Sequence, residues 1–356
     1  MAQNCFDGTA MGDRSADMSL ADTTEITGKA PAADDAPLNR TQAVDTCDLC
    51  GHSDQHVLVE ATPARCRTVM CTHCGLFYAA PSLAVDLLDE FYDDEFEGDA
   101  GTKKRLDGGE IETRKIGIED RLARKWAMPI IREHVDVAGK RVLDVRCRSG
   151  SLAEALTEAG ADVTAIDPLE PNADFARRRN SISDVRFIAI RDLDRLTGFD
   201  DNQFDVVTAL TIHTMSHMPS PRIFLDRLFD VLKPGGYLFL DEKDVLSPVR
   251  GTGASLFDSG PAHFFHFTPD TARKYLERSG LEVIECRIDP VRKKTNKHIR
   301  IVARKPAGDR TNGADLACDN QQVISAWHDA ERKLRRRAGF NKFMKQTRRL
   351  LRKVWH

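Results

Sequence analysis

The sequence predicts an α/β fold, with a mostly parallel seven-stranded sheet covered by helices on both faces and a small cysteine-rich unit in front of it. Three observations lead to this prediction. Short apolar runs alternate with amphipathic segments from residue 119 to about residue 305. Turn signals such as Lys233-Pro-Gly-Gly236 separate them. Two Cys-x-x-Cys-Gly motifs precede the first run. Strands and helices that alternate at this spacing form a parallel sheet between two helical layers.

Each predicted element has its own local signal. The strands are apolar runs of five to seven residues, and the helices carry apolar residues at helical spacing. Thr268 is an N-cap, and Gly160 and Gly280 stand just past helix ends. The expected strands are 141–145, 162–166, 185–190, 204–210, 237–241, 283–288 and 299–303. The expected helices are 83–92, 119–130, 151–159, 172–179, 222–232 and 268–279.

The composition is ordinary for a folded chain and shows no strong electrostatic preference overall. The 356 residues carry a formal net charge of -3, and no apolar run is long enough to cross a bilayer. The first residues lack the basic and apolar regions of a signal peptide. We therefore expect a cytoplasmic protein. The near-neutral charge argues against nucleic acid as a partner.

Four of the nine cysteines form a metal-binding pattern. Cys47 and Cys50 form one Cys-x-x-Cys-Gly motif, and Cys71 and Cys74 form a second one. Each turn directs two thiolates at one point, and four sulfurs in a tetrahedron are a ligand set that Zn²⁺ accepts. A closed four-thiolate site has no open position, so we expect the zinc to be structural. The alternative is four unrelated buried thiols.

These patterns divide the chain into five segments. The first segment has few large apolar side chains and is predicted to be disordered, because it cannot bury enough surface to offset its ordering entropy. The segments are a disordered tail (1–44), a zinc ribbon (45–81), a helical and loop linker (82–118), the α/β domain (119–305), and a linker with a basic amphipathic C-terminal helix (306–356).

The stretch from Val142 to Gly150, Val-Leu-Asp-Val-Arg-Cys-Arg-Ser-Gly, is a strand followed by an acidic residue and a turn that opens a helix. It resembles the first motif of class I S-adenosylmethionine-dependent methyltransferases, which have a Rossmann-like sheet. Phe204-Asp-Val-Val-Thr-Ala-Leu and Leu232-Lys-Pro-Gly-Gly236 are similar to the family's fourth strand and to the turn before its fifth. The resemblance covers roughly residues 119 to 305.

The resemblance implies a set of cofactor-binding residues. Asp144 and Gly150 belong to the first motif. Asp167, at the end of the second strand, stands where the family uses an acid on the ribose hydroxyls. Asp192, after the third strand, stands where an acid commonly contacts the adenine amino group. An acidic residue about twenty positions after the first strand and turn also suits ribose hydroxyls on physical grounds.

The first motif departs from the family pattern at two positions. Arg146 and Arg148 stand where the family has glycine. Glycine keeps such turns open and allows unusual backbone angles, and an arginine adds bulk and a positive charge near a cationic sulfonium. Arg146 either swings outward or meets the carboxylate of the cofactor. The sequence leaves both alternatives open.

Four histidines are candidates for acid–base chemistry, because methyl transfer can require a base that removes a proton from the acceptor. His213 and His217 follow the fourth strand, and His263 and His266 lie in a long loop before the last helix. We take His217 as the first candidate for the base and His263 as the second. For each of them, a hydrogen-bonded structural role is the alternative.

The C-terminal segment after Trp327 is strongly basic, and its apolar residues fall at helical spacing on one face. A basic amphipathic helix can bind an anionic membrane surface, which would place the protein peripherally at the inner membrane surface. The alternative is a helix that packs on its own domain with a solvated basic face.

The zinc-ribbon motifs, followed by Gly75-Leu-Phe-Tyr and Pro81, resemble those of a bacterial subgroup that often methylates sugars or related small metabolites. We therefore predict a methyltransferase that acts on a small-molecule or saccharide-like acceptor. The alternative is a catalytically inactive descendant that keeps the fold as a binding or scaffold module. Arg146 and Arg148 favour the second function, whereas Asp144, Asp167 and Asp192 favour the first.

Overall fold

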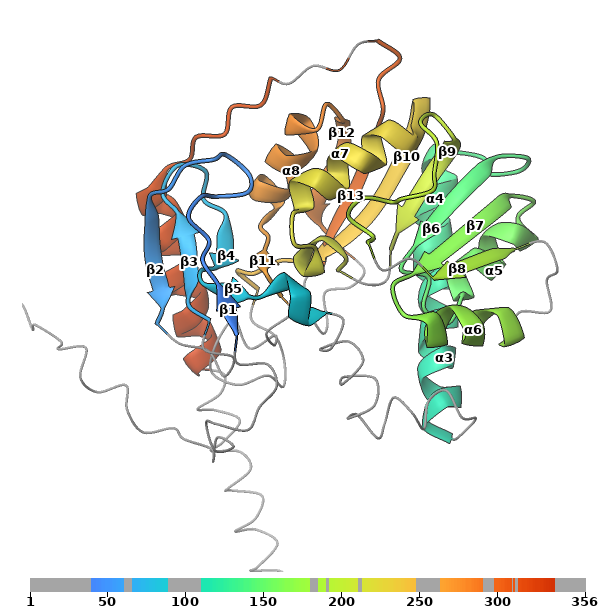
Figure 1. The fold of residues 1–356 in the computed structure, drawn as a ribbon, viewed down its shortest axis with the longest axis horizontal. Helices are drawn as coiled ribbons and strands as arrows, with labels where there is room; N and C mark the ends of the chain where they lie inside the picture. The colour runs from blue at the N-terminus through green and yellow to red at the C-terminus, as the bar shows by residue number, and fades with distance from the viewer. Residues whose placement is uncertain are drawn as a thin grey trace, which may run out of the picture. The chain divides into compact units, whose positions relative to one another are not determined.

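A computed structural model describes most of the chain beyond residue 39 and is shown in Figure 1. The described residues are 40–60, 66–88, 110–179, 185–189, 192–210, 213–247, 263–290, 298–308, 310 and 313–336. The predicted disordered tail and the predicted basic helix therefore lie largely outside the described residues.

The central element is a seven-stranded sheet with the strand order β12-β13-β10-β9-β6-β7-β8. Neighbouring strands are parallel from β10 to β8, whereas β13 is antiparallel to both of its neighbours. The predicted mostly parallel sheet is thus confirmed, with one reversed strand. The strands are β6 (Arg141–Val145), β7 (Asp162–Asp167), β8 (Arg186–Ala189), β9 (Phe204–Ala209), β10 (Leu232–Lys243), β12 (Glu282–Ile288) and β13 (His298–Arg304).

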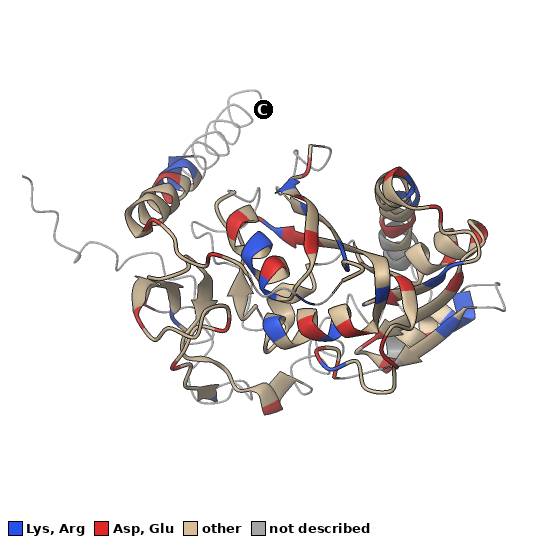
Figure 2. Ribbon diagram, turned by 90° about the horizontal axis from the view of Figure 1, so that it is seen from above, with Lys and Arg blue, Asp and Glu red and all other residues tan. Residues whose placement is uncertain are grey.

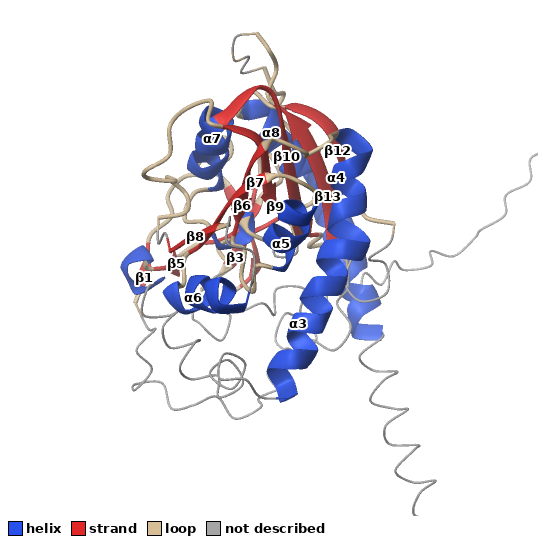
Figure 3. Cartoon of the chain, turned by 90° about the vertical axis from the view of Figure 1, so that its right-hand side faces the viewer, coloured by secondary structure: helices blue, strands red, loops and turns tan. Residues whose placement is uncertain are grey.

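Helices cover both faces of this sheet, as expected from strands whose residues are buried on both sides. Figure 3 shows α3, α4 and α5 on one side and α7 on the other. Successive residues of one strand enter different cores: Phe239 packs with Trp126 and Leu152, whereas Leu240 packs with Phe224 and Tyr275. The helices are α3 (Glu110–Leu122), which continues through a π-helical turn η3 (Ala123–Ala127) into α4 (Met128–His134), and α5 (Ser151–Glu158), α6 (Glu170–Arg179), α7 (Pro221–Val231) and α8 (Pro269–Arg278).

A second, four-stranded sheet belongs to the cysteine-rich unit and has the order β11-β4-β3-β2. Three of its strands come from this unit: β2 (Gln55–Val59), β3 (Thr68–Cys71) and β4 (Phe77–Ala79). The fourth, β11 (Phe265–His266), comes from the segment before α8 and pairs antiparallel with β4. This strand has no counterpart among the predicted elements.

The cysteine-rich unit and the α/β domain share one hydrophobic core. Leu49 and Leu76 of the first belong to the same buried cluster as Phe224 and Tyr275 of the second. Asp48 adds a polar link, because its carboxylate accepts hydrogen bonds from Ser220 Oγ (2.5 Å), Arg222 N (3.1 Å) and Tyr275 Oη (3.0 Å). Two of these donors stand at the N-terminus of α7, where a negative charge is favourable.

Two local boundaries differ from the prediction. The segment expected as a helix at 83–92 starts with the last residue of β5 (Ser82–Leu83) and continues as a short 3₁₀ turn, η2 (Val85–Leu87), whereas residues 89–92 lie outside the described residues. β5 pairs with β1 (Thr41–Gln42), so strand structure begins before residue 45. These three elements are only two or three residues long, and such short pieces leave no periodic pattern in a sequence.

The surface of the described helices mixes charges of both signs, as Figure 2 shows. Arg273 pairs with Glu277 at 3.6 Å on α8, and Arg335 pairs with Glu331 at 3.2 Å on the helix 320–336. Among the described residues, no helix combines the length and the apolar character that crossing a bilayer requires.

Asp48→Ala is expected to lower the free energy of unfolding by about 2 kcal/mol, because it leaves the buried Tyr275 and two partly buried donors without their acceptor. Urea denaturation followed by tryptophan fluorescence measures this change. Asp45→Ala, at an exposed neighbouring position, is the matched control and should unfold like the wild type. Equal unfolding midpoints for the two variants would show that the Asp48 contacts contribute nothing.

Candidate functional site

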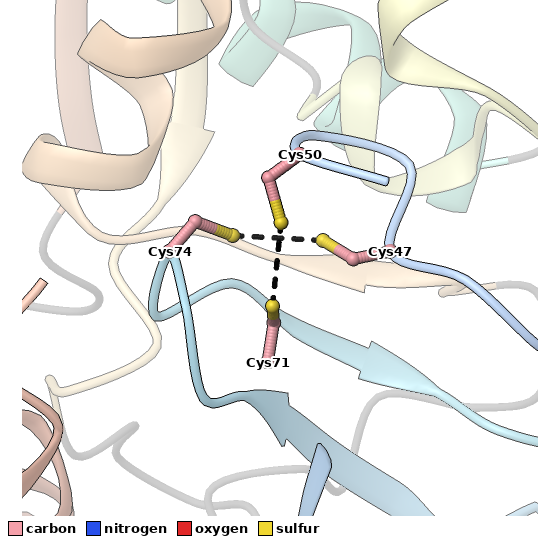
Figure 4. A group of neighbouring side chains, drawn as sticks. All are labelled: Cys47, Cys50, Cys71 and Cys74. Atoms are coloured by element: carbon pink, nitrogen blue, oxygen red, sulfur yellow. Dashed lines mark hydrogen bonds between the residues drawn. The ribbon is translucent and has the colours of Figure 1, made fainter. Parts of the chain in front are cut away.

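The four cysteines of the two Cys-x-x-Cys-Gly motifs converge on one point, as Figure 4 shows. Cys47 Sγ lies 3.5 Å from Cys74 Sγ, and Cys50 Sγ lies 3.4 Å from Cys71 Sγ. The two turns are built alike: Gly51 and Gly75 both have φ near +79° or +78°, and each amide donates to the carbonyl of the first cysteine in its motif. Four sulfurs in this arrangement could hold a tetrahedral metal ion.

The loop between β6 and α5 has the left-handed backbone angles that glycine usually adopts, although two of the three positions concerned are arginines. Arg146 has φ +57° and Arg148 has φ +50°, in the left-handed region that ordinary residues avoid. Gly150, with φ +75°, occupies the last such position. The side chain of Arg148 is 37% exposed and forms an ion pair with Glu119 at 3.1 Å. Arg148 therefore points out of the loop toward α3.

Arg146 has the opposite orientation and is only 9% exposed. It lines a small cavity of about 10 Å³ together with Asp144, Cys147, Ser151 and Leu210. That volume is about what one water molecule needs. Arg146 Nη1 and Asp144 Oδ2 are both buried and have no hydrogen-bond partner. One residue with an unpaired donor and one with an unpaired acceptor thus line the same cavity.

Asp167, at the end of β7, is held by three donors and is 1% exposed. Its Oδ2 accepts from Arg148 N (3.0 Å), and its Oδ1 accepts from Leu169 N (3.1 Å) and Asn172 Nδ2 (3.0 Å). A carboxylate has about four lone-pair positions, so one acceptor position on Oδ2 remains. Asp192 is exposed, and its Oδ2 accepts a hydrogen bond from Thr197 Oγ1.

Burial perturbs the two acids of the loop. Burial raises the pKa of Asp144 to about 7, the Thr208 hydroxyl at 2.7 Å opposes this shift, and the charge of Asp167 adds to it. Burial also raises the pKa of Asp167, although Asn172 and the charge of Arg146 counteract the change. Acids with raised pKa values in a narrow site are typical of functional regions.

Three of the four candidate histidines lie together at the carboxyl edge of the sheet. His213 Nε2 is 3.0 Å from His263 Nε2, and the ring of His217 is centred 4.3 Å from that of His263. Burial lowers the pKa of His213 and of His217 well below the usual value, and the charge of Arg146 lowers both further. These two rings are therefore neutral near pH 7. His266 is farther away, with its ring 6.5 Å from that of His263.

Two contacts hold these histidines in place. Glu242, at the end of β10, accepts from Met215 N (2.6 Å) and Ser216 Oγ (2.7 Å), so it fixes the 3₁₀ turn η4 (Met215–His217) that carries His217. Phe264 N donates to Ser216 O at 2.9 Å, which joins that turn to the segment carrying His263.

Comparisons with known proteins show which family this domain resembles. A family described as a methyltransferase domain matches residues 117–286. A ubiquinone biosynthesis O-methyltransferase of Marinobacter nauticus is 34% identical over 167 residues, which cover 44% of this chain and 69% of the relative. The chain belongs to the S-adenosylmethionine-dependent methyltransferases.

Other relatives match a shorter stretch. The ubiquinone biosynthesis O-methyltransferase of Neisseria meningitidis is 36% identical over 110 residues, so the chain spans 45% of that relative's length. Among solved structures, the 1,6-didemethyltoxoflavin-N1-methyltransferase of Burkholderia thailandensis is 20% identical, with a TM-score of 0.46 over 71% of this chain and 99% of that chain.

The sequence missed two features of this methyltransferase domain. The contact between His213 and His263 joins residues 50 positions apart, and no local pattern reports it. Glu242 carries no motif signal, although its position at the carboxyl end of a central strand could have marked it, since ligands bind at that edge in α/β folds.

Asp144→Asn is expected to change how stability depends on pH. Because the pKa of the folded Asp144 is raised to about 7, above about 3.9 in the unfolded chain, the wild type loses stability as pH rises from about 4 to about 7. The amide does not titrate. The free energy of unfolding of the variant, relative to that of the wild type, should therefore rise by up to about 1.4 kcal/mol per pH unit in this window and stay constant above it.

Urea unfolding at a series of pH values measures this difference. Asp162→Asn, at an exposed position, is the control and should follow the wild type at every pH. A constant difference between the Asp144→Asn variant and the wild type would show that the Asp144 carboxyl does not titrate in this window.

Proposed function

We propose that this protein transfers a methyl group from S-adenosylmethionine to a small-molecule acceptor at the carboxyl edge of the seven-stranded sheet, with a structural zinc in its ribbon. The observation that carries the proposal is the position of Arg146 in a methyltransferase domain: it lines a small cavity with Asp144, and its charge acts on Asp167, His213 and His217.

The polar groups of the loop match the chemistry of this cofactor. Its amino-acid end carries an ammonium group, which suits the unpaired Asp144 Oδ2. The remaining acceptor position of Asp167 suits a ribose hydroxyl. Asp192 is the candidate for the adenine amino group, and Gly150 keeps the start of α5 open. When bound, the cofactor supplies an electrophilic methyl group.

Arg146 limits the room for the cofactor. With its side chain in the loop, the space beside Asp144 holds about one water, so the cofactor needs Arg146 to turn away. Its positive charge also opposes a sulfonium. We therefore infer weak cofactor binding for this family. The same observation favours the second candidate function, a binding or scaffold module without turnover.

The histidine group supplies the base. A neutral imidazole accepts a proton from an acceptor hydroxyl or amine, and His217 on the turn fixed by Glu242 is the first candidate, with His263 the second. The contact between His213 and His263 positions one ring against the other.

For the acceptor we propose a small molecule that is not a saccharide. The names of the relatives refer to ubiquinone biosynthesis and to 1,6-didemethyltoxoflavin, and these names give no support to the saccharide-like acceptor expected from the sequence. The anionic membrane surface expected for the basic C-terminal helix stays a prediction, because residues 337–356 lie outside the described residues.

Arg146→Gly is expected to bind S-adenosylhomocysteine, the demethylated cofactor, about tenfold more tightly, a gain of about 1.4 kcal/mol. The change opens the loop and removes the strain of φ +57°. Arg148→Gly is the matched control: it relieves similar strain but removes a side chain that already points outward, so the affinity should stay close to the wild type.

Isothermal titration calorimetry with the three proteins measures these affinities. Weaker binding by Arg146→Gly would reverse our account of the loop and make Arg146 the partner of the cofactor's carboxylate. No binding by any of the three proteins would retire the methyltransferase proposal and leave the scaffold function.

His217→Ala is expected to lower turnover by about a hundredfold with any acceptor that the wild type methylates, because a positioned base contributes about that much. The affinity for S-adenosylhomocysteine should barely change. Single-turnover rates together with calorimetry separate the two effects. If turnover is equal in variant and wild type, His217 has no part in the reaction, and His263→Ala becomes the variant to measure.

Cys71→Ser is expected to lower the zinc content by about one ion per chain, since a tetrahedral site loses one of its four thiolates. Cys66→Ser is the control, because Cys66 is a buried cysteine of the same ribbon outside the cluster. Elemental analysis measures both. A zinc content that Cys71→Ser leaves unchanged would contradict the ribbon site.

A further inference from the structure

The three clustered histidines form a donor set like the one in the cysteine cluster. One ring nitrogen from each of His213, His217 and His263 lies within 4.8 Å of those from the other two. The rings come from three places: the loop after β9, the turn η4, and the segment before β11. We propose that these three imidazoles bind a second metal ion, a divalent transition metal of the zinc type.

The spacing of the three ring nitrogens is compatible with a shared metal ion. His213 Nε2 and His263 Nε2 are 3.0 Å apart, and a nitrogen of His217 lies within 4.8 Å of a nitrogen of each. In a tetrahedral site with zinc–nitrogen distances of about 2.0–2.1 Å, ligand nitrogens stand about 3.3 Å apart. The observed contact is close to that value, and the third nitrogen, no more than 4.8 Å away, needs only a small ring rotation.

The cysteine cluster offers an internal comparison. Zinc–sulfur distances of about 2.3 Å require sulfurs about 3.8 Å apart in a tetrahedron. The observed sulfur pairs stand at 3.5 Å and 3.4 Å. These two sulfur pairs and the His213–His263 nitrogen pair therefore lie a few tenths of an ångström closer together than the metal-bound spacing.

The protein supports the three rings from outside, as metal sites require. Glu242 fixes the turn of His217 through Met215 and Ser216, and the backbone of Phe264 holds the His263 segment against the same turn. A neutral imidazole offers one nitrogen lone pair to a metal ion.

The charges near the histidine cluster determine which further ligand a bound metal ion would take. Arg146 and Lys243 are cations whose fields reach the histidines, and they oppose a bare divalent ion. An anionic fourth ligand offsets this charge, and three histidines leave that fourth position open. The site therefore favours a metal with a bound hydroxide or acceptor oxyanion.

The binding of an acceptor oxyanion to this metal rests on the proposed function. A metal-bound hydroxyl loses its proton far more readily than a free one. With metal present, the acceptor oxygen would lose its proton to solvent while bound to the ion, and His217 would act as a ligand instead of a base. The metal site itself does not depend on methyl transfer.

Elemental analysis of the full-length protein, incubated with zinc alone and then gel-filtered, tests the site. We expect about two zinc ions per chain in the wild type, and about one in Cys71→Ser and in His263→Ala. The matched control His266→Ala, whose ring stands next to the cluster but outside it, should keep both ions. One ion in the wild type, with no loss in His263→Ala, would overturn the proposal.

Two further measurements guard against a folding artefact. His263→Gln keeps the volume and the hydrogen bonding of the side chain, and it should also lose one ion; retention of both ions by this variant would overturn the proposal. With cobalt in place of zinc, His263→Ala should keep the charge-transfer bands of thiolate ligands and lose only the bands of the nitrogen-bound ion. Neither readout needs turnover or cofactor, so the metal site and the proposed function fail independently.

Discussion

The backbone of one residue, Phe264, joins the parts of the molecule that form the site. Its carbonyl accepts a hydrogen bond from Ala79 N at the end of β4, and its amide donates to Ser216 O in η4, both at 2.9 Å. The segment on either side carries His263 and β11. Buried backbone groups left unpaired cost about 1–3 kcal/mol each. The ribbon, the His217 turn and the His263 segment therefore hold one another in position.

The loop after β6 shows that glycine is not the only way to hold a left-handed backbone. A left-handed conformation costs an ordinary residue about 1–2 kcal/mol, and Arg146 and Arg148 both adopt it. The surrounding hydrogen bonds maintain it: Cys147 N donates to Ile166 O, and Arg148 N donates to Asp167. Strain of this kind persists where the structure around it is rigid, and it is common at ligand sites.

Local signals predicted six of the seven strands of the large sheet to within one residue at each end, because apolar runs are separated by turns such as those at Gly160 and Gly280. The exception is β10, which begins at Leu232 and includes the stretch Lys233–Gly236 that was predicted as a turn. Local signals failed where a partner is distant. β11 has only two residues and exists because Tyr78 and Phe77 lie beside it. Likewise, the orientation of Arg146 depends on packing against Asp144 and Leu210, which periodicity cannot report.

Strand β11, which the α/β part of the chain contributes to the ribbon sheet, limits how the genes of such proteins can recombine. Because the ribbon sheet takes its fourth strand from residues 265–266, far along the chain from the ribbon, the ribbon is not a unit that can be exchanged alone. A chimera with a foreign ribbon leaves β11 beside an edge that no longer matches it, and it loses the bonds of Asp48 to α7. Recombination between relatives should therefore preserve both segments together or replace both.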